Sequence, residues 1–158
     1  METQPFHPSR IKSLKLESNN SGIDLLLQNV GLHLENLGFE DMGKEIYESV
    51  INHCDQIWYL YISWIDHNNI SRFYKLVSHL NKHLKYLTLR KYDTNFVKKI
   101  LKGLGQILLD TLEYLNLHLK IDPNDFKTFF NHCEHVKLKK LLVKNFDYKD
   151  VDIAFDVL

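Results

Sequence analysis

One short pattern of apolar residues returns six times along this chain of 158 residues, and it constrains the fold more than any other feature. The pattern is apolar-x-x-apolar-x-apolar, as in Leu84-x-x-Leu87-x-Leu89. Its last two apolar positions alternate with other residues, which is the period of a strand with one buried face. The six occurrences begin at Ile11, Leu34, Ile57, Leu84, Leu112 and Leu138. They start 23, 23, 27, 28 and 26 residues apart, so the chain consists largely of internal repeats.

The segments between these strands have a different period. Each carries apolar residues at or near i, i+3, i+4 and i+7, which line one face of a helix. The predicted helix faces are Ile23, Leu26, Leu27 and Val30; Met42, Ile46 and Val50; Ile70, Phe73, Tyr74 and Val77; Val97, Ile100, Leu101 and Leu104; Phe126, Phe129, Phe130 and Cys133; and Val151, Ala154, Phe155 and Leu158.

Helix ends are signalled in several places. Asp122-Pro123 predicts an N-cap followed by proline at the first helical position. Asp93 and Asp147 are further candidate caps. The glycines of Gly103-Leu104-Gly105 predict a turn that ends the fourth helix.

A strand followed by a helix in every repeat predicts an α/β solenoid with one parallel sheet. Periods of roughly 20–29 residues are typical of leucine-rich repeats. We therefore expect a polar tail over 1–10 and about six irregular leucine-rich repeats over 11–158. Because strands stack about 4.8 Å apart and helices about 10 Å apart, the array should curve into a horseshoe segment. Strands then line its concave face and helices its convex face.

The repeats depart from the usual consensus at the ninth position, where Asn or Cys is expected. Only the first unit has asparagine there, so the buried polar ladder of regular repeats is mostly absent. The six ninth positions are Asn19, Met42, Ile65, Tyr92, Lys120 and Phe146.

Two related segments, Ile51-Asn-His-Cys-Asp55 and Phe130-Asn-His-Cys-Glu134, place a cysteine shortly before a strand. Together with Leu84-Lys-Tyr-Leu-Thr-Leu89 and Leu112-Glu-Tyr-Leu-Asn-Leu117, they resemble the cysteine-containing repeats of a fungal family of F-box/leucine-rich-repeat proteins. The resemblance covers roughly residues 11 to 158. It implies substrate selection in a cullin-RING (SCF) ubiquitin ligase, where an F-box holds the Skp1 adaptor and the repeats hold the target.

The sequence departs from that family at its start. Ten residues before Ile11 are too few for an F-box of three helices, so Skp1 and the cullin complex are expected partners only of a longer form. Two alternatives remain open: a stand-alone repeat scaffold without a ligase link, and a truncated, non-functional paralogue. The identity of the protein target is not predicted.

The concave strand positions are the first candidates for function. The aromatic residues Tyr59, Tyr86 and Tyr114 occupy one pattern position in consecutive units, which predicts a column of rings. Tyr, Trp and Arg dominate binding hot spots. The simpler interpretation is that aromatic residues only support the sheet. The predicted protein-binding residues are Trp58, Tyr59, Tyr61, Tyr86, Arg90, Tyr114, Asn116 and His118.

Composition argues against several other functions. Lys plus Arg equals Asp plus Glu, at 20 each, whereas nucleic-acid binders usually carry a basic excess. Two cysteines are too few for a disulfide framework, and no leader or bilayer-spanning run is evident, which predicts a cytoplasmic or nuclear protein without a membrane partner. A zinc site at His132, Cys133 and His135 is a weaker interpretation than a core role for Cys133.

No catalytic motif stands out, so we expect neither an enzyme nor a cofactor. The chain should stop inside an apolar helix face, leaving both edges of the sheet exposed.

Overall fold

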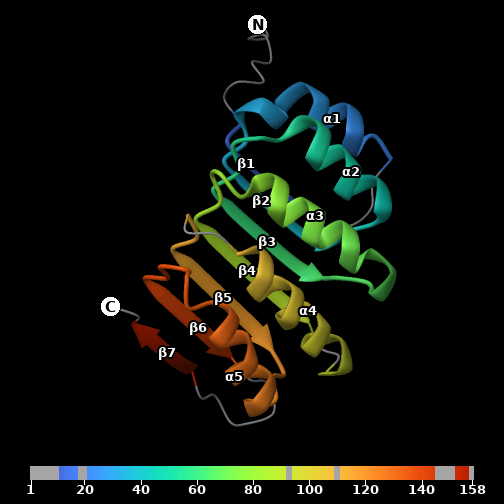
Figure 1. Cartoon of the computed structure of the whole chain (residues 1–158). Helices are drawn as coiled ribbons and strands as arrows, with labels where there is room; N and C mark the ends of the chain where they lie inside the picture. Colours follow the sequence, from blue (N-terminus) through green and yellow to red (C-terminus); the bar gives the residue numbers. More distant parts are fainter. Residues whose placement is uncertain (1–10, 18–20, 92–93, 109–110, 145–151, 157–158) are drawn as a thin grey trace, which may run out of the picture.

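The computed structural model shows helices and strands alternating along the chain. Five of its parallel strands are each followed by a helix on the same side of the sheet, so neighbouring units stack side by side (Figure 1). The structure describes residues 11–17, 21–91, 94–108, 111–144 and 152–156. The predicted caps Asp93 and Asp147 and the ninth-position residues Asn19, Tyr92 and Phe146 lie outside these ranges.

Six strands form a parallel sheet in chain order, and a seventh adds to its end. The strands are β1 (Ser13–Leu16), β2 (Asn36–Asp41), β3 (Tyr59–Trp64), β4 (Tyr86–Lys91), β5 (Tyr114–Leu119), β6 (Lys140–Lys144) and β7 (Asp152–Asp156). This order means that each crossover connects nearest neighbours, as the repeat predicts.

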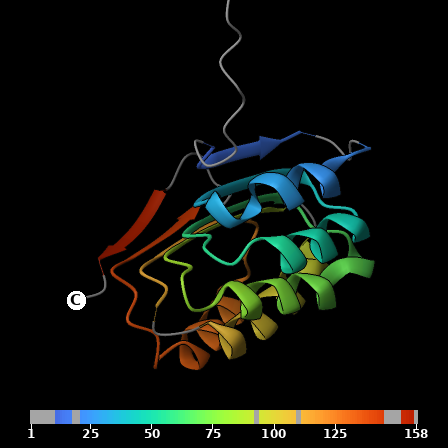
Figure 2. The ribbon, with the colours of Figure 1, turned by 90° about the horizontal axis from the view of Figure 1, so that it is seen from above.

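The described helices form a second layer that covers one face of the sheet (Figures 1 and 2). They are α1 (Ile23–Val30), α2 (Lys44–His53), α3 (Ile70–Leu80), α4 (Thr94–Ile107) and α5 (Pro123–His132), with the short 3₁₀ helices η2 (Gly31–His33) and η3 (His67–Asn69). The predicted cap of α5 is confirmed: the Asp122 side chain accepts a hydrogen bond of 2.8 Å from the Asn124 N–H, and Pro123 is the first helical residue.

The core lies between the two layers and runs through the whole stack as one cluster. The register pairs the same pattern position of neighbouring strands, so that one leucine of each repeat lies beside the next. This row begins at the half-buried Leu14 and continues through Leu37, Leu60, Leu87, Leu115 and Leu141, each of these five no more than 1% exposed. The predicted alignment of Leu60, Leu87 and Leu115 is confirmed.

The turns after the strands replace the missing asparagine ladder with apolar contacts. Met42 and Ile65, both at the ninth position, are buried. A polar contact is nevertheless kept nearby, because the Asn69 side chain lies buried and its Nδ2 donates to the Met42 carbonyl at 3.5 Å. Asn69 therefore bridges two consecutive repeats from a different sequence position.

The predicted turn at Gly103 and Gly105 is wrong, because α4 continues through both residues to Ile107. The glycines instead allow neighbouring helices to approach. A methyl group on Gly103 would overlap the Tyr74 ring of α3, whose hydroxyl donates to the Lys99 carbonyl at 2.6 Å. Close packing between helices, and not chain reversal, is the role of these glycines.

The predicted sixth helix is also wrong. Residues Asp152–Asp156, including Ala154 and Phe155, form the strand β7, while Val151 and Leu158 lie outside the described residues. The sequence Asp-Ile-Ala-Phe-Asp also has a period of two, and that period governs here. β7 runs antiparallel to β6 and pairs with its edge, so the sheet ends at β1 and at β7 instead of at β1 and β6.

Candidate protein-binding face

The face of the sheet opposite the helices carries the predicted binding residues. Side chains alternate along each strand, as the burial of β5 shows, where Leu115, Leu117 and Leu119 are buried and the residues between them are half-buried. We call this side the open face. Its residues are Ser13, Lys15, Asn36, Gly38, Glu40, Tyr59, Tyr61, Ser63, Tyr86, Thr88, Arg90, Tyr114, Asn116, His118, Lys140, Leu142 and Lys144.

Three tyrosines form a row across the middle of the open face. The register pairs Tyr59 with Tyr86 and Tyr86 with Tyr114, as the repeat predicts. The rings of Tyr86 and Tyr114 are stacked, with centroids 4.5 Å apart and planes 4° from parallel, and the Tyr59 ring lies tilted 6.4 Å from Tyr86. Tyr86 is 37% exposed. The row thus presents rigid, half-exposed aromatic surface at low entropic cost, which is suited to binding.

Two tryptophans on β3 and beside it are exposed. Trp58 precedes β3 with 47% of its surface exposed, while its carbonyl accepts hydrogen bonds of 2.8 and 2.9 Å from the N–H groups of Lys85 and Tyr86. Its backbone therefore holds the start of β4, and its ring stays at the surface. Trp64, at the end of β3, is 40% exposed and was not predicted as a site residue. Its sequence position gave no sign of a binding role, since aromatic residues are common in strands.

A polar network that sequence reasoning missed crosses the first four strands. Lys15 Nζ lies 2.7 Å from Glu40 Oε1, and the Tyr61 hydroxyl donates to the same carboxylate at 3.4 Å. Arg90 Nη1 donates to the Tyr61 hydroxyl, also at 3.4 Å. The hydrogen bond from Lys15 lowers the pKa of Glu40, and the same contact raises the pKa of Lys15. These four residues are far apart in the sequence, and they meet because their strands are neighbours in the sheet.

The other predicted residues lie on β4 and β5. Arg90 is the register partner of His118, so two basic residues lie side by side. Asn116 lies between Thr88 and Leu142, and its Oδ1 is buried and accepts no hydrogen bond among the described residues. All eight predicted residues therefore lie on one side of three adjacent strands or immediately before them.

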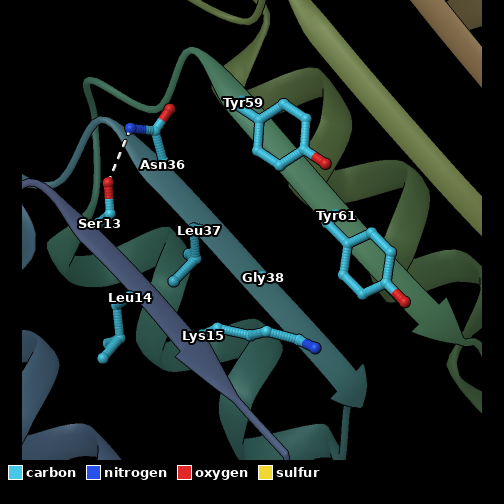
Figure 3. Close-up of a pocket in the computed structure, with 8 residues that line it drawn as sticks. All are labelled: Ser13, Leu14, Lys15, Asn36, Leu37, Gly38, Tyr59 and Tyr61. Carbon is cyan, nitrogen blue, oxygen red and sulfur yellow. Dashed lines mark hydrogen bonds between the residues drawn. The ribbon is translucent and has the colours of Figure 1, made fainter.

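The described residues of this face line hollows in two places. One of about 560 Å³ lies over β1 and β2, between Lys15 and the side chains of Tyr59 and Tyr61 (Figure 3). Its lining residues are Ser13, Leu14, Lys15, Asn36, Leu37, Gly38, Tyr59 and Tyr61. The other, of about 280 Å³, lies over β4 to β6 beside Tyr86 and Tyr114. Both are within or near the size range of roughly 300–1,000 Å³ that ligand pockets occupy.

The two cysteines lie in the core, as the repeat interpretation predicts for Cys133. His132 lies exposed on α5, with its Nδ1 2.7 Å from the Thr128 carbonyl oxygen, and His135 Nε2 lies 3.0 Å from the Leu108 carbonyl oxygen. Within the described ranges, no group of three or more His, Cys, Asp or Glu residues is placed to hold a metal.

Burial raises the pKa of both thiols, Cys54 and Cys133, to about 12, and the nearby Asp55 adds to the shift at Cys54. We expect a thiol reagent at pH 8 to react far more slowly with the native protein than with the denatured chain, because the thiolate is the nucleophile. Both folded pKa values lie above the ordinary thiol pKa of 9.0, so the neutral thiols stabilise the fold fully below about pH 8. That contribution is lost as pH rises from 9 to 12.

Two measurements check this expectation. The rate of native thiol modification at pH 8 should be limited by opening of the fold. The free energy of unfolding should fall between pH 9 and pH 12, and it should fall less steeply in Cys54→Ala. Rapid native modification would contradict the buried placement of these residues.

No described helix is long and apolar enough to cross a membrane. Comparisons of the chain with protein-family models, with curated proteins and with solved structures return no match.

Proposed function

We propose that this chain is a leucine-rich-repeat module that recognises another protein through the open face of its sheet. The observation that carries the proposal is the row of Tyr59, Tyr86 and Tyr114, half-exposed on the side that the described helices leave uncovered, with Tyr114 stacked on Tyr86 and Tyr59 tilted against it. Tyrosine supplies a large contact area with few rotatable bonds, and it is enriched at binding hot spots. Leucine-rich repeats would place this row on the concave wall of the array.

The proposal extends to the partner system through sequence resemblance. We propose that the chain is the substrate-binding repeat region of an F-box-type ubiquitin-ligase receptor. The support is the likeness of the segments around Cys54, Leu87, Leu115 and Cys133 to cysteine-containing repeats of F-box proteins. The repeats then select the target, and a separate F-box provides the link to Skp1 and the cullin complex.

The open-face part is tested with a paired set of variants. A partner is first captured from the source organism with the full chain and purified, and its affinity is then measured for each variant. Replacing both Tyr86 and Tyr114 by serine should weaken binding at least tenfold, because truncation of one hot-spot aromatic typically costs about 2 kcal/mol. The matched control is Phe130→Ser, which removes an exposed aromatic residue from α5 on the helical side.

The control should bind like the unmodified chain. A partner whose affinity depends on Phe130 but not on the two tyrosines would overturn the proposal. Thermal unfolding of each variant separates lost binding from lost folding.

The ligase part has its own test. The full-length gene product is co-expressed with Skp1, and the chain of 158 residues serves as the comparison. We expect Skp1 to co-purify with the longer product and not with the repeats alone. A longer product that never recovers Skp1 rejects the ligase link and leaves open-face recognition intact.

A further inference from the structure

The larger hollow on the open face begins where the tyrosine row stops. The register places Asn36 beside Tyr59 and Gly38 beside Tyr61, so short residues follow two aromatic ones on the neighbouring strand. Gly38 has no side chain, and the Lys15 side chain crosses β2 close to it (Figure 3). The floor of the hollow is therefore strand backbone and the aliphatic stem of Lys15, with aromatic rings as one wall.

The shape of the hollow favours a ring as occupant. Tyr59 contacts Tyr86 on one side, and on its other side it has only Asn36 as neighbour in the row. A planar group placed over β2 would lie one strand spacing, about 4.8 Å, from Tyr59. It would continue the aromatic row across the sheet at the separation that Tyr86 and Tyr114 already adopt.

The charge of the hollow favours an uncharged group. Lys15 and Glu40 neutralise each other through their contact of 2.7 Å, and Lys15 Nζ lies 5.6 Å from the centre of the Tyr61 ring. The remaining polar side chains, Ser13 and Asn36, are neutral and hydrogen-bonded to each other at 2.9 Å. A charged occupant would gain no counter-charge here and would lose hydration.

The charge of the face changes further along the sheet. Among the open-face positions of β4 and β5, the charged or titratable types are Arg90 and His118, whereas Lys140 and Lys144 on β6 are register partners of Asp156 and Asp152 on β7. Arg90 and His118 lie nearest to the hollow. Counting about 4.8 Å per strand and about 7 Å along the strands, they are about 12 Å and 16 Å from Gly38. An extended chain covers these distances in about three to five residues.

We propose that the hollow over Gly38 binds an aromatic side chain of an extended partner segment that carries an acidic residue three to five positions away, directed at Arg90 and His118. The inference rests on the proposed function of the open face and names the chemistry of its partner. The ring anchors the segment by stacking on Tyr59, and the carboxylate sets its direction and register across the strands.

A library of random twelve-residue peptides displayed on phage, selected against the immobilised full chain, tests this inference. The selected sequences should share Trp, Tyr or Phe with Asp or Glu three to five positions away. Selected peptides are then synthesised with a fluorophore, and their affinities are measured by anisotropy. Replacing their aromatic residue by alanine should weaken binding at least tenfold.

Variants of the chain locate the binding site. Gly38→Val places its side chain in the hollow and should weaken binding at least tenfold. The fold should tolerate the variant, because a Cβ at this position meets its neighbours at ordinary contact distances of 3.4 Å and longer. Gly38→Ala provides a milder version in case valine impairs folding. Arg90→Gln should weaken the binding of peptides that carry the acidic residue, but not of peptides in which that residue is replaced by glutamine. Ser78→Val, an exposed position of α3, introduces the same side chain on the helical side and should change nothing.

The outcomes separate this inference from the one on which it rests. Some peptides could need Tyr86 and Tyr114 for binding and yet bind folded Gly38→Val unchanged. That result overturns the proposal that the hollow binds the aromatic residue, and it leaves open-face recognition intact. Peptides insensitive to both sets of variants overturn both. An empty selection, or selected sequences without an aromatic residue, also overturns the aromatic anchor.

Discussion

Replacing Leu87 by alanine should lower the free energy of unfolding by about 3 kcal/mol, because it empties a buried site in the middle of the sheet. Leu87 is 1% exposed and lies between Leu60 and Leu115 in the buried row, so its removal opens a cavity against two neighbouring repeats. Because each unit contacts mainly its neighbours, the lost packing falls on the centre of the array. Urea denaturation followed by circular dichroism measures the change.

The adjacent residue provides the control. Thr88 projects from the opposite side of β4, and Thr88→Val keeps its shape and its preference for strands. We expect it to change stability by no more than about 1 kcal/mol, because Thr88 is buried but the substitution removes only a hydroxyl and opens no cavity. Equal destabilisation by the two variants would contradict the assignment of the buried and open faces.

Gly31→Ala should cost about 2 kcal/mol, although it adds only one methyl group. The new Cβ would overlap the backbone carbonyl of His53 and lie 3.0 Å from Cys54 Sγ. A carbonyl at the end of a packed helix cannot rotate away as a side-chain tip can, so α1 and α2 must separate. Thermal unfolding of the variant should show the loss as a drop of several degrees in Tm.

Gly38→Ala is the matched comparison, since it makes the same chemical change at a site where a Cβ meets Lys15 and Tyr61 at 3.4 and 3.5 Å. We expect it to leave stability unchanged or slightly raised, because alanine restricts the unfolded chain more than glycine does. If the two variants unfolded alike, close helix packing at Gly31 would be refuted.

The repeat register could be predicted because it depends on spacing alone. Two alternating apolar positions in each unit set the buried face. Because this pair holds the same position in every repeat, aligned strands place Leu60, Leu87 and Leu115 side by side. The same register brought Tyr59, Tyr86 and Tyr114 together on the open face. A residue that repeats in phase with the strands must form a row, whatever its chemistry.

Features that break the period could not be predicted in this way. Gly103 resembles a helix end in sequence, and only the position of Tyr74 on the neighbouring helix shows why glycine is needed within α4. The contact between Lys15 and Glu40 joins two strands through long, flexible side chains whose directions the strand period does not determine. Residues 152–156 fit a helix or a strand by composition, and the free edge of β6 decides between them.

The antiparallel direction of β7 makes the two ends of the array unequal. A further strand–helix unit of the repeating kind needs a parallel strand as its neighbour, and β7 offers one running the wrong way. Among the described strands, β1 is the one parallel strand with a neighbour on a single side. Lengthening this protein by grafted units should therefore succeed ahead of β1 or between existing units, and fail beyond β7.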